Sequence, residues 1–154
     1  MSLNRFINSF SAFPKQLFRM NNGAKIRLRA AEGPSRPKRS FDLLTLSGKV
    51  QPKATTPHTY EWPNGASMRP NSATLHELLL GFRGANVIVY EIPRGTTLPD
   101  DLILVHEFAD HYSLQAAKEM SVEELNKKLT AFFAKHGRIC SRDEWFEKYP
   151  NPTE

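Results

Sequence analysis

Two histidines and two carboxylates fall within six residues of this chain, in the segment H-E-F-A-D-H from His106 to His111. Side chains of these types can bind a metal or exchange protons. A helical zinc site needs histidines at positions i and i+4, whereas these two are five positions apart in a segment that reads as strand and turn. We therefore expect no metal at this cluster.

Cys140 is the only cysteine, so the chain cannot form an internal disulfide or a cysteine-rich zinc site. It lies between two predicted helices with no evident base beside it, and we interpret it as a packed, unreactive thiol. The sequence also contains neither a Walker loop nor a G-x-G-x-x-G motif, which excludes the common nucleotide cradles.

A second group of polar residues is spread along the chain at about one per predicted strand. The group is Arg19 in L-F-R-M, Ser67 in N-G-A-S-M-R-P, and His111, Tyr112 and Gln115 in D-H-Y-S-L-Q. Taken singly, each has an ordinary structural explanation, such as an exposed arginine or a core histidine with satisfied hydrogen bonds. They become informative only if the fold brings them together.

Short apolar runs predict the strands that would position this group. Leu17, Phe18 and Met20 surround Arg19 as in a strand, and Asn22-Gly23 signals a turn. Three further strands are expected, over residues 87–92, 102–105 and 111–115, with a turn at 93–96. Because no helix separates these three, they predict an antiparallel meander.

Three helices are predicted from their caps and from apolar spacing. The first begins after Ser72 and ends at Gly81 or Gly84, and the second covers residues 122–135. The third is short and ends at Pro150. Capping boxes mark the last two, at Ser121–Glu124 and Ser141–Glu144, and the apolar faces comprise Leu75, Leu78, Leu79, Val122, Leu125, Leu129, Phe132, Phe133, Trp145 and Phe146.

The stretch from Gly33 to Pro63 is dominated by glycine and proline, and we interpret it as long loops with one strand. Its apolar cluster, residues 41–46, fits a short helix or a strand. With helices and strands both present, the fold class is α+β.

The length of 154 residues, with 40% hydrophobic and 24% charged, fits one globular domain. No apolar run approaches the roughly 18 to 20 residues of a membrane span. We expect residues 1–13 to be a flexible segment before a single domain over 14–150, and the protein to be a monomer. The predicted location is cytoplasmic, with the mitochondrial matrix as the alternative because the first 31 residues contain no acid.

Charge is unevenly distributed along the chain. Residues 1–60 hold eleven Lys/Arg and two acids, whereas the rest hold ten Lys/Arg and fourteen acids. A basic half can bind nucleic acid, a membrane surface or nucleotide phosphates. Its phenylalanines do not interleave with the basic residues as a base-stacking surface requires, which disfavours a nucleic-acid-binding module but leaves it as the alternative.

The order of motifs resembles that of a known family. L-F-R-M, G-A-S-M, I-P-R-G-T-T-L-P-D-D-L-I-L and D-H-Y-S-L-Q, followed by a long amphipathic helix, are similar to toxins of the ADP-ribosyltransferase fold typified by a small bacterial type VI secretion effector with fungal relatives. The similarity covers residues 16–135 and is strongest from Gly65 to Phe133. It implies a compact, mixed, mainly antiparallel sheet with a few flanking helices, and a cleft that binds NAD as substrate.

The resemblance also implies residue roles. Arg19 would hold a ribose or pyrophosphate oxygen of NAD, and Ser67 would shape the nicotinamide pocket. Tyr112 would stack on the nicotinamide ring, and His111 would hydrogen-bond a ribose. These groups suit cleavage of the nicotinamide glycosidic bond through an oxocarbenium-like transition state.

The chain departs from the family pattern where many members carry a late-strand glutamate. Here D-H-Y-S-L-Q offers Gln115 and the preceding Asp110, and Glu107 is the nearest glutamate. We expect Gln115, Glu107 and His111 to be the catalytic residues. Strand alternation puts His111 and Gln115 on one face and Tyr112 on the other.

Because glutamine lacks the negative charge, three outcomes stay open. They are transfer of ADP-ribose to a protein or nucleic-acid acceptor, NAD glycohydrolase activity, and an inactive interaction domain that keeps the fold.

Overall fold

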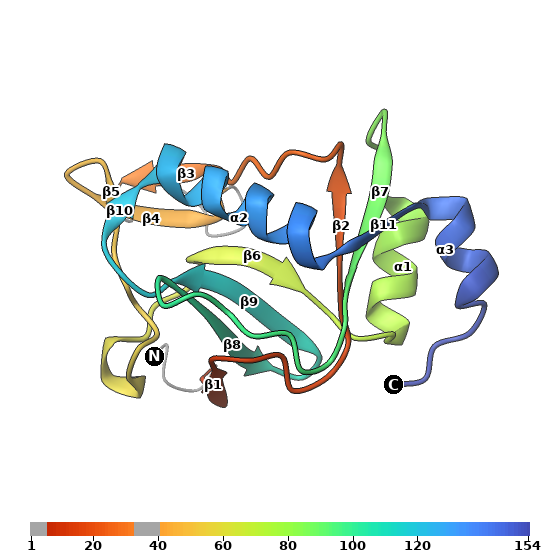
Figure 1. The fold of residues 1–154 in the computed structure, drawn as a ribbon, viewed down its shortest axis with the longest axis horizontal. Coiled ribbons are helices and arrows are strands. Elements are labelled where there is room, and N and C mark those ends of the chain that lie inside the picture. The colour runs from red at the N-terminus through yellow and green to blue at the C-terminus, as the bar shows by residue number, and fades with distance from the viewer. Residues whose placement is uncertain (1–5, 33–40) are drawn as a thin grey trace.

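The computed structural model describes residues 6–32 and 41–154, which form three helices and eleven strands (Figure 1). The helices are α1 (Ala73–Gly81), α2 (Val122–His136) and α3 (Arg142–Lys148), and Pro57–Thr59 forms one turn of 3-10 helix. The strands are β1 (Asn8–Phe10), β2 (Leu17–Asn22), β3 (Ala30–Glu32), β4 (Leu43–Leu46), β5 (Lys49–Val50), β6 (Gly65–Met68), β7 (Val87–Ile92), β8 (Leu102–Phe108), β9 (His111–Ala116), β10 (Met120–Ser121) and β11 (Arg138–Ser141).

The strands form three sheets, with the orders β1-β8-β9-β6, β11-β7-β2 and β10-β5-β4-β3. All described pairings are antiparallel except that of β3 with β4. The first two sheets meet where Phe18 of β2 pairs with Arg69, the residue after β6. This junction brings strands from distant parts of the sequence side by side, and the candidate site lies across it.

The main core lies between α2 and the sheets. Leu125, Leu129 and Phe133 of α2 have no exposed surface and belong to one apolar cluster with Leu104 and Leu114 of β8 and β9. Burying such side chains removes apolar surface from water, at about 1.5–3 kcal/mol for each. The helix therefore holds the β8–β9 hairpin in place from its apolar side.

A smaller core lies under α1 and α3, beside β2 and β7 (Figure 1). Trp145 of α3 is fully buried, and its ring meets Phe18 edge-on at 5.3 Å between centroids. Leu75 and Leu79 of α1 complete the cluster. Because Phe18 also forms the junction with Arg69, this core fixes the position of its neighbour Arg19.

The structure confirms the α+β class and the predicted helices. Ser72 caps α1 by accepting a hydrogen bond from Leu75 N at 3.2 Å, and Ser141 and Glu144 form a complete capping box at α3. At α2, Ser121 accepts from Glu124 N at 3.1 Å. The predicted capping box is only half formed at α2, because the Glu124 carboxylate does not bond back to Ser121 and lies 3.9 Å from Lys128 Nζ.

One strand prediction is wrong. The predicted three-strand meander is wrong, because β7 pairs with β2 and β11 while β8 pairs with β1 and β9. The long connection from Pro93 to Asp101 lets the chain leave one sheet and enter another. The ambiguous cluster at 41–46 contains a strand, β4, and β11 was not anticipated because its pattern is too short to show a period.

The N-terminal residues that the structure describes pack onto the domain. Asn8, Ser9 and Phe10 pair with β8, and Phe13 is 2% exposed within the main core. The expected flexible segment, residues 1–13, thus includes an edge strand and a core residue, and residues 1–5 lie outside the described part.

We predict that Leu129→Ala lowers the free energy of unfolding by about 2–5 kcal/mol, because the side chain is fully buried and its removal leaves a cavity. Lys127→Ala, on the exposed side of the same helix, is the matched control and should change stability little. Chemical denaturation of both variants measures the difference. Equal stabilities would show that this face of α2 does not form the core.

Candidate active site

The junction of the two sheets places Arg19 against β6. Phe18 N donates to Arg69 O at 2.7 Å, and Arg69 N donates to Phe18 O at 3.0 Å. From the next position, Arg19 Nη1 donates to the Ser67 carbonyl at 3.1 Å and Nη2 donates to Asn21 Oδ1 at 3.2 Å. The guanidinium is thereby held in one orientation on the face that carries the Ser67 side chain.

The Arg19 guanidinium retains an unused donor. Its Nε atom is buried and makes no hydrogen bond within the described part of the chain. Burial lowers the pKa of Arg19 to about 10, because desolvation penalises the charged form. At neutral pH the group is still charged, and an anion bound beside the guanidinium would compensate that charge.

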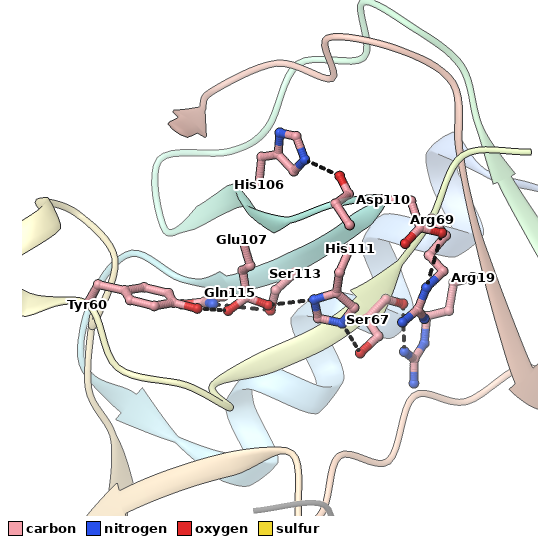
Figure 2. Close-up of polar contacts among 11 residues, drawn as sticks. Arg19, Tyr60, Ser67, Arg69, His106, Glu107, Asp110, His111, Ser113 and Gln115 are labelled. Atoms are coloured by element: carbon pink, nitrogen blue, oxygen red, sulfur yellow. Dashed lines mark hydrogen bonds and ion pairs between the residues drawn. The ribbon is translucent and has the colours of Figure 1, made fainter. Parts of the chain in front are cut away.

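Ser67 and His111 meet across the β6–β9 pair. Ser67 is exposed, and its Oγ lies 3.0 Å from His111 Nε2 (Figure 2). Both side chains project from the face opposite the main core, since their neighbours Ala66, Met68 and Tyr112 belong to the core cluster. The exposed hydroxyl and the partly buried imidazole therefore lie together on one surface.

A buried carboxylate stands behind the imidazole. His111 Nδ1 lies 2.8 Å from Glu107 Oε1, and the Tyr60 hydroxyl donates to Glu107 Oε2. A register shift between His106 and Phe108 makes Glu107 the extra residue of β8, which is how the strand can aim this side chain at His111. Tyr60, Glu107, His111 and Ser67 form a continuous polar chain (Figure 2).

Gln115 lies on the same face of β9, beside its partner Gly65 on β6. Its side chain has no exposed surface, its Nε2 donates to Ser113 Oγ at 3.1 Å, and its Oε1 has no hydrogen-bond partner within the described residues. The two strands approach closely here, because a Cβ atom added at Gly65 would lie 2.7 Å from both Gln115 Cγ and Ser113 Oγ. Gln115 therefore packs between β9 and β6 and is not accessible to a ligand.

Tyr112 lies on the other face of β9, within the main core. Its ring stacks on His106 at 4.2 Å between centroids, and burial raises the pKa of its hydroxyl. The structure therefore does not bring Tyr112 together with Arg19, Ser67 and His111.

Asp110 is engaged at the start of α1. It accepts a hydrogen bond from Ser72 Oγ at 2.5 Å, and Arg69 Nε lies 3.5 Å from the same carboxylate. Burial lowers the pKa of Arg69, and the charge of Asp110 opposes that shift. Asp110 thus anchors the junction of β6, α1 and β9.

Sequence reasoning missed two aromatic residues at the site. Tyr60 lies in the proline-rich segment and contacts Glu107 only through tertiary packing, so no local signal could reveal it. Phe108 is 37% exposed and stacks on His111 at 5.1 Å between centroids. An aromatic residue at the end of a strand, beside a turn, was a signal that could have identified it.

The family model described as Tse2 ADP-ribosyltransferase toxin matches residues 15–145 of the chain, which include every residue of the polar chain. The chain belongs to this family. The resemblance drawn from the sequence motifs is therefore confirmed. No curated protein matches.

Among the described residues, no group of three or more His, Cys, Asp or Glu side chains could hold a metal ion, and no helix is long and apolar enough to cross a membrane. The Cys140 thiol is half-buried, and desolvation raises its pKa, which leaves less of the reactive thiolate at neutral pH.

We predict that Gly65→Ala destabilises the domain by about 1–3 kcal/mol, because the added methyl group overlaps Gln115 and Ser113 and forces the strands apart. Gly81→Ala is the control, since nothing lies within 4 Å of the added methyl group. Thermal unfolding of the two variants provides the comparison. A Gly65→Ala protein as stable as the parent would contradict the close approach of β6 to Gln115.

Proposed function

We propose that this domain cleaves the nicotinamide glycosidic bond of NAD and transfers the ADP-ribosyl group to an acceptor, with the Arg19–Ser67–His111–Glu107 face as its active site. The observation that carries the proposal is the contiguous polar chain on one exposed face of a member of an ADP-ribosyltransferase toxin family. NAD is the substrate that the family implies.

Arg19 is the proposed phosphate ligand. Its positive charge and fixed orientation suit a pyrophosphate oxygen, and binding an anion compensates for the desolvation of the guanidinium. Ser67 and Phe108 then lie on either side of His111, where they would contact the nicotinamide riboside. In this arrangement the exposed ring of Phe108 takes the stacking role that the resemblance gave to Tyr112.

Glu107 is the proposed source of the negative charge that opposes the oxocarbenium-like transition state. It lies behind His111, with Oε1 2.8 Å from the imidazole Nδ1, and the imidazole contacts the exposed Ser67 hydroxyl. A charge held in a buried, preorganised position acts more strongly than one in water. Glu107 thereby replaces the late-strand glutamate that this chain lacks, and Gln115 becomes a positioning residue that supports Ser113 and β6.

A second candidate site, a cavity beside α2, fits this reaction less well. It has a volume of about 490 Å³ and lies between α2 and the segment 97–102, lined by Leu98, Phe132 and Lys135 among others. None of the residues of the polar chain lines it. Lys128, its other lysine, is already paired with Asp101 at 2.7 Å.

The described cations also favour a dinucleotide over a nucleic acid. A nucleic-acid surface needs several unpaired basic side chains on one face. Four basic residues of the N-terminal half are instead paired with acids, as Lys15–Glu154, Arg29–Asp42, Lys49–Glu119 and Lys53–Glu61.

We predict that the purified protein releases nicotinamide from NAD and that Arg19→Ala weakens NAD binding roughly ten- to hundredfold, the loss expected for a hydrogen bond to a charged partner. Arg94→Ala, which removes an exposed arginine from a turn, is the control. Calorimetric titration with NAD and chromatographic detection of nicotinamide test both statements. A folded parent protein that neither binds nor cleaves NAD would overturn the proposed function.

Glu107→Gln should lower the rate of nicotinamide release by about a hundredfold or more, because the amide keeps the volume but removes the charge behind His111. Glu119→Gln, an exposed acid, serves as the control. Since Glu107 is buried, each variant is first checked for its melting temperature. Equal rates in folded Glu107→Gln and in the parent would remove Glu107 from the mechanism.

A further inference from the structure

Ser67, His111 and Glu107 stand in the order of a nucleophile, a base and an orienting acid. Ser67 Oγ lies 3.0 Å from His111 Nε2, and His111 Nδ1 lies 2.8 Å from Glu107 Oε1. Hydroxyl, imidazole and carboxylate linked at such distances activate serine in several unrelated enzyme folds, where the arrangement is recognised by geometry rather than by sequence order.

The contacts favour one orientation of the imidazole. His111 Nδ1 lies at ion-pair distance from Glu107 Oε1, although it is not aligned for a hydrogen bond, and Nε2 faces the Ser67 hydroxyl. The Tyr60 hydroxyl donates a hydrogen bond to the second carboxylate oxygen and so keeps Glu107 directed toward His111. The imidazole is thus oriented to accept the serine proton.

Ser67 differs from the serines that have structural roles in this fold. Ser72, Ser121 and Ser141 cap helices, and Ser113 is buried against Gln115. Ser67 is exposed in the middle of β6, and its hydroxyl bonds to His111 alone within the described chain. An electrophile in solution can reach this oxygen.

We propose that Ser67 is an activated nucleophile that accepts the ADP-ribosyl group, so that the protein modifies itself at its own site; this rests on the proposed NAD cleavage. Ser67 Oγ forms a bond to the ribose carbon attached to nicotinamide. The bond from that carbon to the ring nitrogen breaks, and nicotinamide leaves with the electron pair. The serine proton passes to His111 Nε2, giving an imidazolium ion beside Glu107 and then a proton in solution.

The first arm of the test needs no NAD. A small fluorophosphonate probe should label Ser67 in the parent protein, with the serine proton going to His111 and fluoride leaving. Labelling should slow about a hundredfold or more in Glu107→Gln and in His111→Ala, because the base is lost or misoriented. Peptide mapping identifies the labelled residue, and Ser11, an exposed serine in the bend after β1, is the internal control that should stay unlabelled.

The second arm incubates the parent protein with NAD and follows nicotinamide release and intact mass together. We expect a mass increase of one ADP-ribosyl group mapped to Ser67, absent in Ser67→Ala and retained in Ser11→Ala. Nicotinamide release without an adduct at Ser67 would overturn this inference and leave the proposed function standing. Absence of nicotinamide release would overturn both, and a Ser67 that resists the fluorophosphonate would show that the hydroxyl is not activated.

Discussion

The reciprocal hydrogen bonds between Phe18 and Arg69 join two sheets that otherwise share no strand, and the candidate site depends on this junction. Arg19 lies on β2, near the start of the chain, whereas Ser67 and His111 lie on β6 and β9 of another sheet. The junction is stabilised on one side by Phe18 packed against Trp145 and on the other by Arg69 beside Asp110. Any change in this packing alters the distance between the arginine and the polar chain.

The second constraint is the cost of a buried carboxylate. Glu107 is 3% exposed, and an isolated ionised carboxylate in such a position would be costly. The Tyr60 hydroxyl donates to one oxygen and His111 Nδ1 lies 2.8 Å from the other, so each carboxylate oxygen has a polar partner. A fold that needed only packing at this position could carry an apolar residue. The carboxylate held behind His111 is what makes this face suited to chemistry.

The sequence predicted the helices well because their signals are local. Ser141 and Glu144 form the expected capping box, and the apolar spacing of Leu125, Leu129 and Phe132 identified the buried face of α2. Strand partners depend on long connections, so the placement of β7 in a separate sheet could not be read from its own residues.

Part of the site was also predictable, because some of its residues stand in short local motifs. Arg19, Ser67 and His111 stood out in short motifs, and the structure brings them together. Alternation along β9 also placed Tyr112 on the opposite face from His111 and Gln115, which was visible in the sequence. The role of Tyr60 depends on a tertiary contact, so its own sequence neighbours do not indicate it. The bulge that directs Glu107 toward His111 contains no glycine or proline, the residues that would signal such an irregularity in the sequence.

The proposed site is best tested by a crystal structure of the protein with an NAD analogue whose nicotinamide bond cannot be cleaved. We expect a pyrophosphate oxygen within hydrogen-bond distance of the Arg19 guanidinium, and the nicotinamide riboside over Ser67 and His111. An analogue bound in the cavity beside α2, or elsewhere away from Arg19, would contradict it.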